Sequence, residues 1–239
     1  MKSVTKGSLR VLSRRALAAA GAASACVSAA ACKDNTSPTK LTPSVVQAEA
    51  PDTLAGIVGT VLDTQLVVRV VDASGVPVPS TIVAFTASGA IVNPANPATD
   101  DSGLVRATVT LGTVAGTDTV RAAIVTATPP PPVIFIVVAK AGAPAQITTV
   151  SGDQQTAPAG TQLPSPLVAQ VTDQFGNAVA GVTVAWSTSG SGILGAASSQ
   201  SDANGMVQVT FTLGASPGAE SVTAQVSSSI TDTFTETGQ

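Results

Sequence analysis

Apolar and polar residues alternate with a period of two along several short segments of this chain. In segment 207–213, Val207, Val209, Phe211 and Leu213 alternate with polar residues, and segment 105–111 repeats the pattern. Alternation of this kind is typical of antiparallel strands that cover a core on one face. No segment after residue 31 has the 3.6-residue period of a helix, so we predict an all-β fold with almost no helix.

The chain contains two copies of one unit. Asp72, Gly75 and Phe85 in the first copy correspond to Asp173, Gly176 and Trp186 in the second, each 101 positions later. A unit of about 100 residues with short strands and frequent turns has the size of an immunoglobulin-like sandwich. We therefore predict tandem Ig-like domains at 43–142 and 143–239. Val209, Phe211 and Trp186 are expected to be buried.

The turns of the repeat carry a recognisable order of residues. It runs Val-x-Asp-x-x-Gly-x-x-Val, then Val-x-Phe/Trp, then Thr/Ser-Asp-x-x-Gly, then an alternating strand that ends in Leu-Gly. This order resembles the group 1 bacterial Ig-like domain, the module repeated in invasin and intimin adhesins. The resemblance covers about residues 43–239, and the first copy departs from it at Ser80, where the second copy has Gly181. It implies a stalk or an adhesion module.

The first 31 residues have the pattern of a secretory signal. Five basic residues precede an uncharged, Ala-rich stretch that runs from Ala16 to Ala31. This stretch is too short and too weakly apolar for a membrane-spanning helix. The sequence from Ala29 to Cys32 resembles the lipobox of bacterial lipoproteins, in which the Cys is lipidated after cleavage.

We predict lipidation at Cys32 and a signal peptide of the lipoprotein type at 1–31. An ordinary signal peptide cut after Ala-x-Ala would leave Cys32 unmodified, and Cys26 is a poorer lipidation candidate. Residues 32–42 are polar and unpatterned, so they are expected to form a flexible tether. The predicted location is the cell envelope, with a lipid anchor in the outer membrane or at the cell surface.

Charge excludes some partners. After residue 31 there are six basic and 14 acidic residues, a net charge of −8, and no Lys or Arg follows Lys140. Such a surface repels nucleic acid and anionic lipid headgroups. We therefore expect no nucleic-acid partner, and membrane contact only through the N-terminal anchor. The expected partner is a protein or a surface polymer.

Three motifs are compatible with ligand binding but lack a required part. Gly190–Gly195 fits the dinucleotide fingerprint, yet residues 196–204 have no helical period and are expected to form a loop. Asp202–Gly205 begins like a calcium loop, but Leu213 stands where the EF-hand has Glu. A different calcium site near the domain junction would need Asp72, Asp100, Asp101 and Asp153 to meet; we favour turn-capping roles for them. No metal or cofactor is predicted.

No catalytic residues are predicted. The chain has no His, so a Ser nucleophile lacks its usual base, and its only Glu residues, Glu49, Glu220 and Glu236, lie far apart in sequence. Trp186 aligns with Phe85 within an inward-facing pattern, which favours a core position over sugar stacking. We therefore predict a protein that is not an enzyme.

One strand is apolar on both faces. Four prolines, 129–132, precede Val133–Val138, and the matching strand of the second copy is polar on one face. The outer residues Ile134, Ile136 and Val138 are predicted to form a partner-binding edge by strand addition, or to be covered by the Pro-rich loop or the second copy. The favoured function is a structural stalk or adhesion module. The alternative is a binding module for an extracellular or cell-wall polysaccharide.

Overall fold

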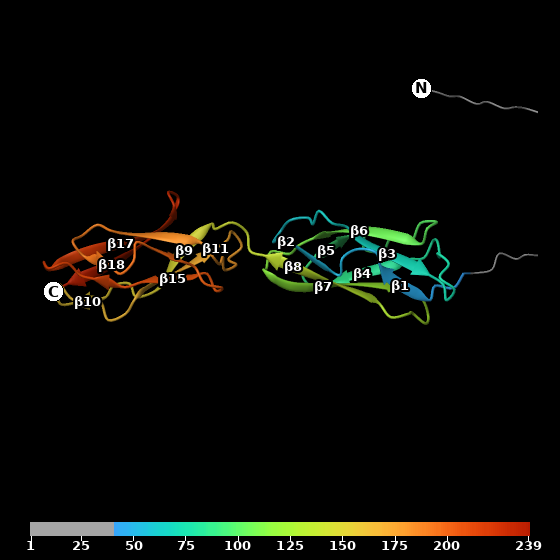
Figure 1. Ribbon diagram of the computed structural model, residues 1–239, viewed down its shortest axis with the longest axis horizontal. Helices are drawn as coiled ribbons and strands as arrows, with labels where there is room; N and C mark the ends of the chain where they lie inside the picture. Colours follow the sequence, from blue (N-terminus) through green and yellow to red (C-terminus); the bar gives the residue numbers. More distant parts are fainter. Residues whose placement is uncertain (1–40) are drawn as a thin grey trace, which may run out of the picture. The chain divides into compact units, whose positions relative to one another are not determined.

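The computed structural model of the protein describes residues 41–239 (Figure 1). All regular structure in these residues is β-strand, which confirms the all-β prediction. This part of the chain contains no helix long and apolar enough to cross a membrane. Cys32 and the predicted signal 1–31 lie outside the described residues.

The first sandwich consists of two four-stranded sheets. Their orders are β1-β3-β6-β5 and β2-β8-β7-β4. All neighbours pair antiparallel except β2 and β8, which are parallel. The strands are β1 (Val45–Ala48), β2 (Thr53–Ile57), β3 (Leu66–Val71), β4 (Val83–Ala87), β5 (Ile91–Asn93), β6 (Leu104–Thr110), β7 (Gly116–Ile124) and β8 (Val133–Lys140).

The second sandwich repeats this plan. One sheet has the order β10-β18-β17-β12-β14, and the opposite layer has β15-β11-β9 together with the pair β13-β16. The strands are β9 (Gln146–Ser151), β10 (Thr156–Ala157), β11 (Leu167–Thr172), β12 (Thr183–Thr188), β13 (Ile193–Leu194), β14 (Ser198–Gln200), β15 (Met206–Val209), β16 (Phe211–Thr212), β17 (Gly218–Ser227) and β18 (Ile230–Gly238). Segment 196–204, which was expected to form a loop, therefore contains the short strand β14.

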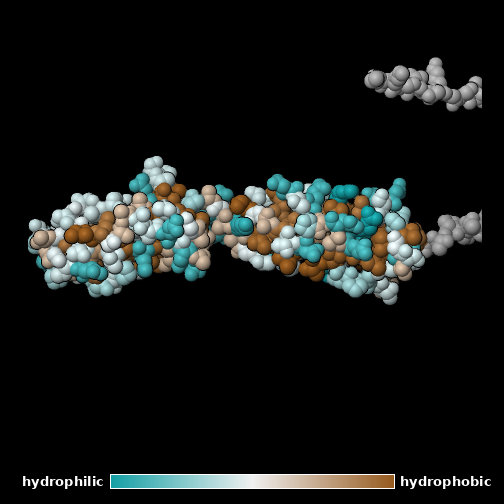
Figure 2. Space-filling model, viewed as in Figure 1, coloured by the Kyte–Doolittle hydropathy of each residue, from teal (hydrophilic) through white to brown (hydrophobic). Residues whose placement is uncertain are grey.

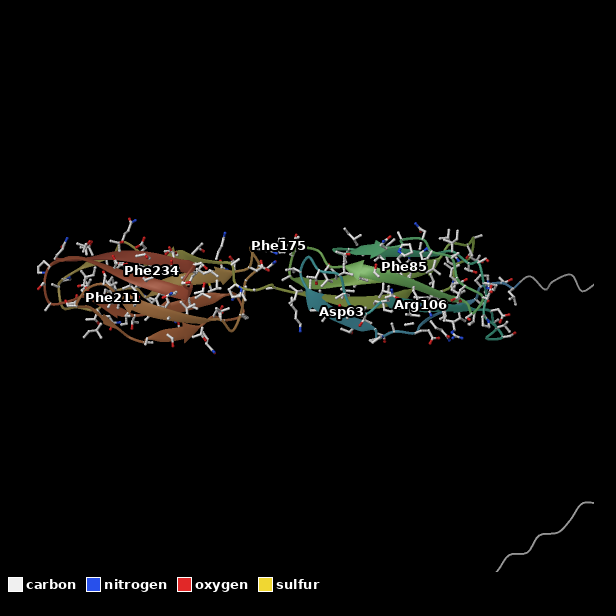
Figure 3. All side chains as sticks on the ribbon, turned by 90° about the horizontal axis from the view of Figure 1, so that it is seen from above. Asp63, Phe85, Arg106, Phe175, Phe211 and Phe234 are labelled. Atoms are coloured by element: carbon white, nitrogen blue, oxygen red, sulfur yellow. The ribbon has the colours of Figure 1, made fainter. Side chains whose placement is uncertain are left out.

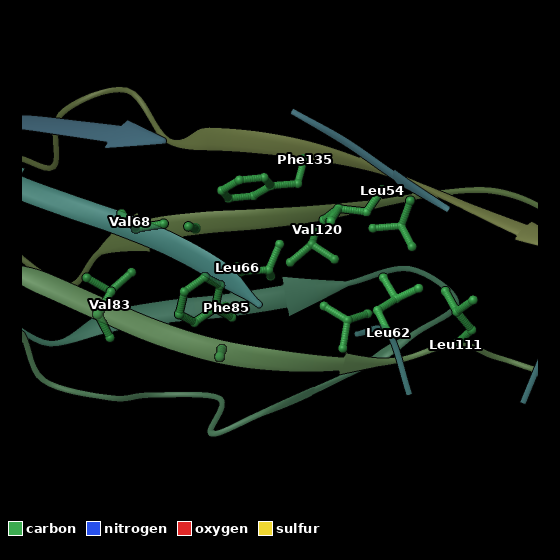
Figure 4. Packing of buried hydrophobic residues seen from close by; sticks show 14 of the residues in the cluster. Leu54, Leu62, Leu66, Val68, Val83, Phe85, Leu111, Val120 and Phe135 are labelled. Atoms are coloured by element: carbon green, nitrogen blue, oxygen red, sulfur yellow. The ribbon is translucent and has the colours of Figure 1, made fainter. Parts of the chain in front are cut away.

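Each sandwich has its own hydrophobic core. In the first, the inward residues of both sheets meet around Leu66, Val120 and Phe135 (Figure 4). In the second, Phe211 and Phe234 lie between the layers (Figure 3), and Trp186 packs against Phe234 with ring centroids 6.1 Å apart. Trp186, Val209 and Phe211 are buried as predicted. The two cores share no residue.

Four turns are built in the same way, one pair in each sandwich. At each, an Asp Oδ1 accepts hydrogen bonds of 2.8–2.9 Å from the backbone N–H groups two and four residues later. Each turn contains a Gly at φ between 71° and 84°, a region that Gly tolerates without strain. The Asp residues are Asp72, Asp100, Asp173 and Asp202. The predicted turn-capping role is confirmed for Asp72 and Asp100, whereas Asp153 accepts a hydrogen bond from the distant Thr235 N.

Candidate interaction face on the first sandwich

Strand β8 lies inside its sheet. It pairs with β2 over Thr53–Ile57 on one side and with β7 on the other. From Ile136 to Ala139 both backbone edges of β8 are paired, so another strand cannot add there. The β2 ladder begins at Ile136 and does not include Ile134. The prediction of a partner-binding edge is therefore wrong at Ile136 and Val138. What β8 presents to solvent is the outer face of a sheet.

The outer side chains of β8 form an apolar row that neither the Pro-rich loop nor the second copy covers. Ile134 and Ile136 are 47% and 41% exposed, Val138 is half-buried, and Ile57 of β2 is exposed beside the row. On the side seen in Figure 2, hydrophobic residues gather more over the sandwich of β1–β8 than over the other one.

The second sandwich has threonines where the first has this row. The ladder register places Thr233, Thr235 and Thr237 of β18 at the positions of Ile134, Ile136 and Val138 of β8. These threonines are exposed. Threonine keeps the strand preference of a β-branched residue while it offers a polar group to water. The fold itself therefore does not require isoleucine at these positions.

Two cations border the apolar row. Arg121 lies opposite Ile134 in the β7–β8 ladder, and Lys140 lies opposite Ile57 in the β2–β8 ladder. The other two basic residues of 41–239 are paired, Arg69 with Glu49 at 2.9 Å and Arg106 with Asp100 at 3.6 Å. Neither Arg121 nor Lys140 has an ion pair with a described carboxylate, and the outward residues of β2, β4 and β7 beside them include no Asp or Glu.

We call this surface the aliphatic face: Ile57, Ile134, Ile136 and Val138 with Arg121 and Lys140. The six residue steps from Ile134 to Lys140 span about 20 Å of strand. An apolar strip of this length with a positive charge near each end complements a surface that is apolar in the middle and acidic around it.

The aspartates considered for a calcium site do not come together. Asp72 and Asp100 cap their own turns, and Asp153 Oδ1 accepts a hydrogen bond from Thr235 N at 2.8 Å. Within residues 41–239 no group of three or more metal-ligating side chains is present. The described residues therefore provide no metal site of that kind.

Sequence reasoning missed one pair of carboxylates. Glu220 of β17 and Glu236 of β18 lie opposite each other in the ladder, and both are buried. Glu220 accepts hydrogen bonds from Gly214 N and Gly192 N at 2.6 and 2.8 Å, whereas only Oε2 of Glu236 is bonded, to Gln155 N at 2.7 Å. Because Glu236 is fully buried, it cannot reach a substrate unless the sandwich opens.

Burial raises the pKa of Glu236. The hydrogen bond from Gln155 N lowers the pKa and the nearby negative charge of Asp153 raises it further, so the net shift is upward. No Lys or Arg is present in residues 143–239 to offset the charge. The pair could have been suspected from the sequence, since both residues are at inward positions of their alternating strands.

Hydrogen bonds also connect the turn of Asp173 to the chain before it. Asp173 Oδ2 accepts from Gly142 N at 2.9 Å, and Asn177 bonds Thr113 O and Ala115 N, both at 2.8 Å. Burial alone would raise the pKa of Asp173, but the bonds from Gly142, Asn177 and Phe175 lower it to about 2. The first copy has Val76 in place of Asn177, so this use of the turn is specific to the second copy.

The Gly-rich run at 190–195 is not a phosphate loop. Gly192 N donates to Glu220 Oε2, and the run leads into the short strand β13. A dinucleotide site needs a helix N-terminus after the last Gly, and no helix follows in the described chain.

Comparison with known proteins gives a family match for part of the chain and a similar fold for most of it. Residues 147–237 match the model of the bacterial Ig-like domain (group 1). No match was found among curated proteins.

Several solved structures resemble the chain. For the Escherichia coli adhesin FdeC, identity is 21%, the TM-score is 0.55, and the match covers 83% of this chain and 64% of that one. For Yersinia pseudotuberculosis InvD, identity is 19%, the TM-score is 0.50, and the match covers 80% of this chain and 56% of that one. The D0-D1 domain of intimin matches at 19% identity and a TM-score of 0.31, over 81% of this chain and 98% of that one. The chain spans less than two thirds of FdeC and InvD, and such identities show the fold alone.

Proposed function

We propose that the chain is a non-enzymatic module of the bacterial surface that displays an interaction face, and the premise is the match of residues 147–237 to the model of the group 1 bacterial Ig-like domain. The Escherichia coli adhesin FdeC has a similar fold, which supports a surface role. The observation that carries the proposal is the aliphatic face of the first sandwich, where an exposed apolar row meets the only two basic residues of 41–239 without a described ion-pair partner.

The rest of the proposed organisation comes from the sequence. The signal peptide 1–31 directs export, Cys32 receives the lipid, and residues 32–42 tether the first domain to the membrane. The domain boundary lies between residues 142 and 143. A single lipid-modified Cys with a short tether would hold the first sandwich within about 35 Å of the membrane surface.

The partner of the aliphatic face is a protein with an acidic rim around an apolar patch. Charge complementarity supports this choice, because Arg121 and Lys140 border the strip and no outward carboxylate of the flanking strands lies beside them. Packing of the face against the same face of a second copy is disfavoured. Either twofold arrangement would place these cations against cations.

The face can be tested by photo-crosslinking in cells that produce the full chain. A benzophenone amino acid at Thr119, which lies opposite Ile136, should yield a protein adduct. The same group at the exposed Gln225 of the second sandwich is the control. The adduct should fall at least about fivefold in the I134T/I136T variant, which copies the residues of the second sandwich, and in R121E/K140E.

I134T/I136T should fold, because threonine already occupies the matching positions of β18. R121E/K140E should fold because both side chains are exposed. An adduct that persists unchanged in both variants, adducts only to lipid, or no adduct at Thr119 would contradict the proposal.

A second candidate function, binding of a surface polysaccharide, is favoured by a different observation. The second sandwich carries an amide-rich groove that is lined by no Lys or Arg, and the aligned residues of the first sandwich are not amides.

A further inference from the structure

Two adjoining hollows lie on the surface of the second sandwich and share Gln208. The first, of about 330 Å³, is lined by Gln162, Pro164, Pro166 and Thr210 among others. The second, of about 280 Å³, is lined by Val168, Ser199, Gln200 and Met206 among others. Together they form what we call the amide groove, defined by Gln162, Gln200 and Gln208. The first hollow lies at the lower end of the size range of small-ligand sites and the second just below it, and both are open to solvent.

Three separate segments bring the glutamines to this groove. Gln208 of β15 lies opposite Val168 of β11, on the outer face of that sheet. Gln200 comes from β14 at the edge of the other sheet. Gln162 forms a bridge with Thr212. All three glutamines are exposed, as the outward polar positions of alternating strands should be.

The chemistry of the groove is that of a neutral site. Each amide can donate and accept hydrogen bonds at once, as each sugar hydroxyl does. Pro164, Pro166 and Val168 add apolar surface that can contact the C–H faces of sugar rings. The charged residue that lines the groove is Asp202, and its Oδ1 is already bonded to Asn204 N and Met206 N.

An anionic ligand fits poorly. Residues 143–239 contain six carboxylates and no Lys or Arg, so a phosphate or uronate would meet repulsion without a cation to bind it. A protein partner would fit poorly too. A protein–protein interface needs a continuous apolar centre, and the three glutamines interrupt the apolar surface of the groove. The ligand that matches the groove is an uncharged, hydroxyl-rich chain.

The groove belongs to the second copy and is not a general feature of the fold. The residues that align with Gln162, Gln200 and Gln208 in the first copy are Val61, Ala98 and Arg106. Arg106 is in an ion pair with Asp100. The first sandwich therefore lacks all three amides and serves as an internal comparison.

We propose that the amide groove binds a neutral polysaccharide chain. This inference rests on the second candidate function and does not depend on the aliphatic face. The openness of the groove leaves much of a bound chain in water, so affinity per site is weak, with a Kd of about 0.1–1 mM.

The protein carries a reporter for this site. Trp186 Nε1 donates a hydrogen bond of 2.8 Å to Ser199 Oγ, and Ser199 lines the groove. Trp186 is the single Trp of the chain. A ligand that contacts Ser199 should therefore change the indole fluorescence.

The test uses electrophoresis of the full chain in native gels that contain dextran, β-glucan, mannan or xylan, with polygalacturonate as the anionic comparison. At least one neutral polymer should retard the protein and change its Trp fluorescence, and polygalacturonate should not. Q200A/Q208A should raise the apparent Kd for the polymer at least about tenfold, because the variant loses the hydrogen bonds of two amide side chains. Q225A, an exposed Gln-to-Ala change on β17, should have no effect.

The proposal is overturned if no neutral polymer retards the protein, if Q200A/Q208A and Q225A behave alike, or if polygalacturonate binds equally well. The I134T/I136T variant should bind the polymer normally. Loss of the crosslink without loss of polymer binding, or the reverse, therefore separates the two functions.

Discussion

Among single residues, Glu236 stands out because its side chain is fully buried while its Oε1 has no hydrogen-bond partner. The first sandwich has Val137 at the same place in its ladder, opposite Asp118. The second sandwich therefore has a carboxylate where the first sandwich has an apolar side chain. A buried charge with an unsatisfied oxygen lowers the stability of the folded state.

We predict that E236Q stabilises the second sandwich by about 1–2 kcal/mol at neutral pH. Glutamine is uncharged and its amide oxygen can still accept from Gln155 N. The measurement is chemical unfolding followed by Trp186 fluorescence, which reports on this sandwich. E220Q should have the opposite sign and destabilise by about 1–3 kcal/mol, because both oxygens of Glu220 accept backbone N–H groups.

The raised pKa of Glu236 predicts that the stability of the second sandwich depends on pH. The pKa of Glu236 is raised above its ordinary value of 4.5 in the folded state. The folded chain therefore binds a proton that the unfolded chain has released, and the stabilising effect is complete below pH 4.5 and lost as pH rises through the raised pKa. As pH rises from 4.5 through the raised pKa of Glu236, the free energy of unfolding of the wild type should fall relative to that of E236Q. Parallel curves for the two proteins would contradict the argument.

At the scale of the element, β8 shows how one strand carries two different roles. Phe135 and Val137 are fully buried and face the core, whereas Ile134 and Ile136 face solvent. Although both faces of this strand are apolar, comparison with the matching strand of the second copy predicts Ile134, Ile136 and Val138 as the outer residues. The exposure of Ile134 and Ile136 and the burial of Phe135 and Val137 confirm that orientation.

We predict that F135A destabilises the first sandwich by about 3–5 kcal/mol, the cost of a large cavity. I136A should change stability by less than about 1 kcal/mol, because little buried contact is removed. Differential scanning calorimetry of the full chain measures both. Similar losses for the two variants would show that the outer row is buried by something else.

At the scale of the whole molecule, the two cores have no residue in common. Contacts within each sandwich therefore set its stability separately, apart from the hydrogen bonds of Asp173 and Asn177. We expect two thermal transitions, of which only one changes Trp186 fluorescence.

F234A should lower the transition of the second sandwich by at least about 12 °C, since a loss of about 3 kcal/mol shifts a domain of this size by that amount. The transition of the first sandwich should stay within about 2 °C. I134T/I136T is the control and should leave both transitions in place. A single transition that moves as one in F234A would show that the sandwiches unfold together.

The fold could be predicted from the sequence because its causes are local or repeated. Alternation with a period of two specifies strands whose inward residues are Val209, Phe211 and Trp186. The Asp-x-x-Gly turns contain both the capping carboxylate and the Gly that takes positive φ. Duplication of the whole pattern then gives two sandwiches.

The candidate sites depended on the tertiary structure, because they combine residues from distant segments. Strand order turned the expected edge at β8 into the outer face of a sheet, and register placed Arg121 and Lys140 beside it. Ladder pairing brought Glu220 to Glu236, and the fold brought Gln162 to the same hollow as Gln208.

The sequence by itself determined which residues of each strand are apolar, where the chain turns, and that the unit occurs twice, since each of these is encoded within a few neighbouring residues. Only the folded chain decided which strands are neighbours and whether the outer apolar face of β8 is covered. Those outcomes depend on pairings between segments far apart in the chain, whose contacts compete with one another and are not written in any single stretch.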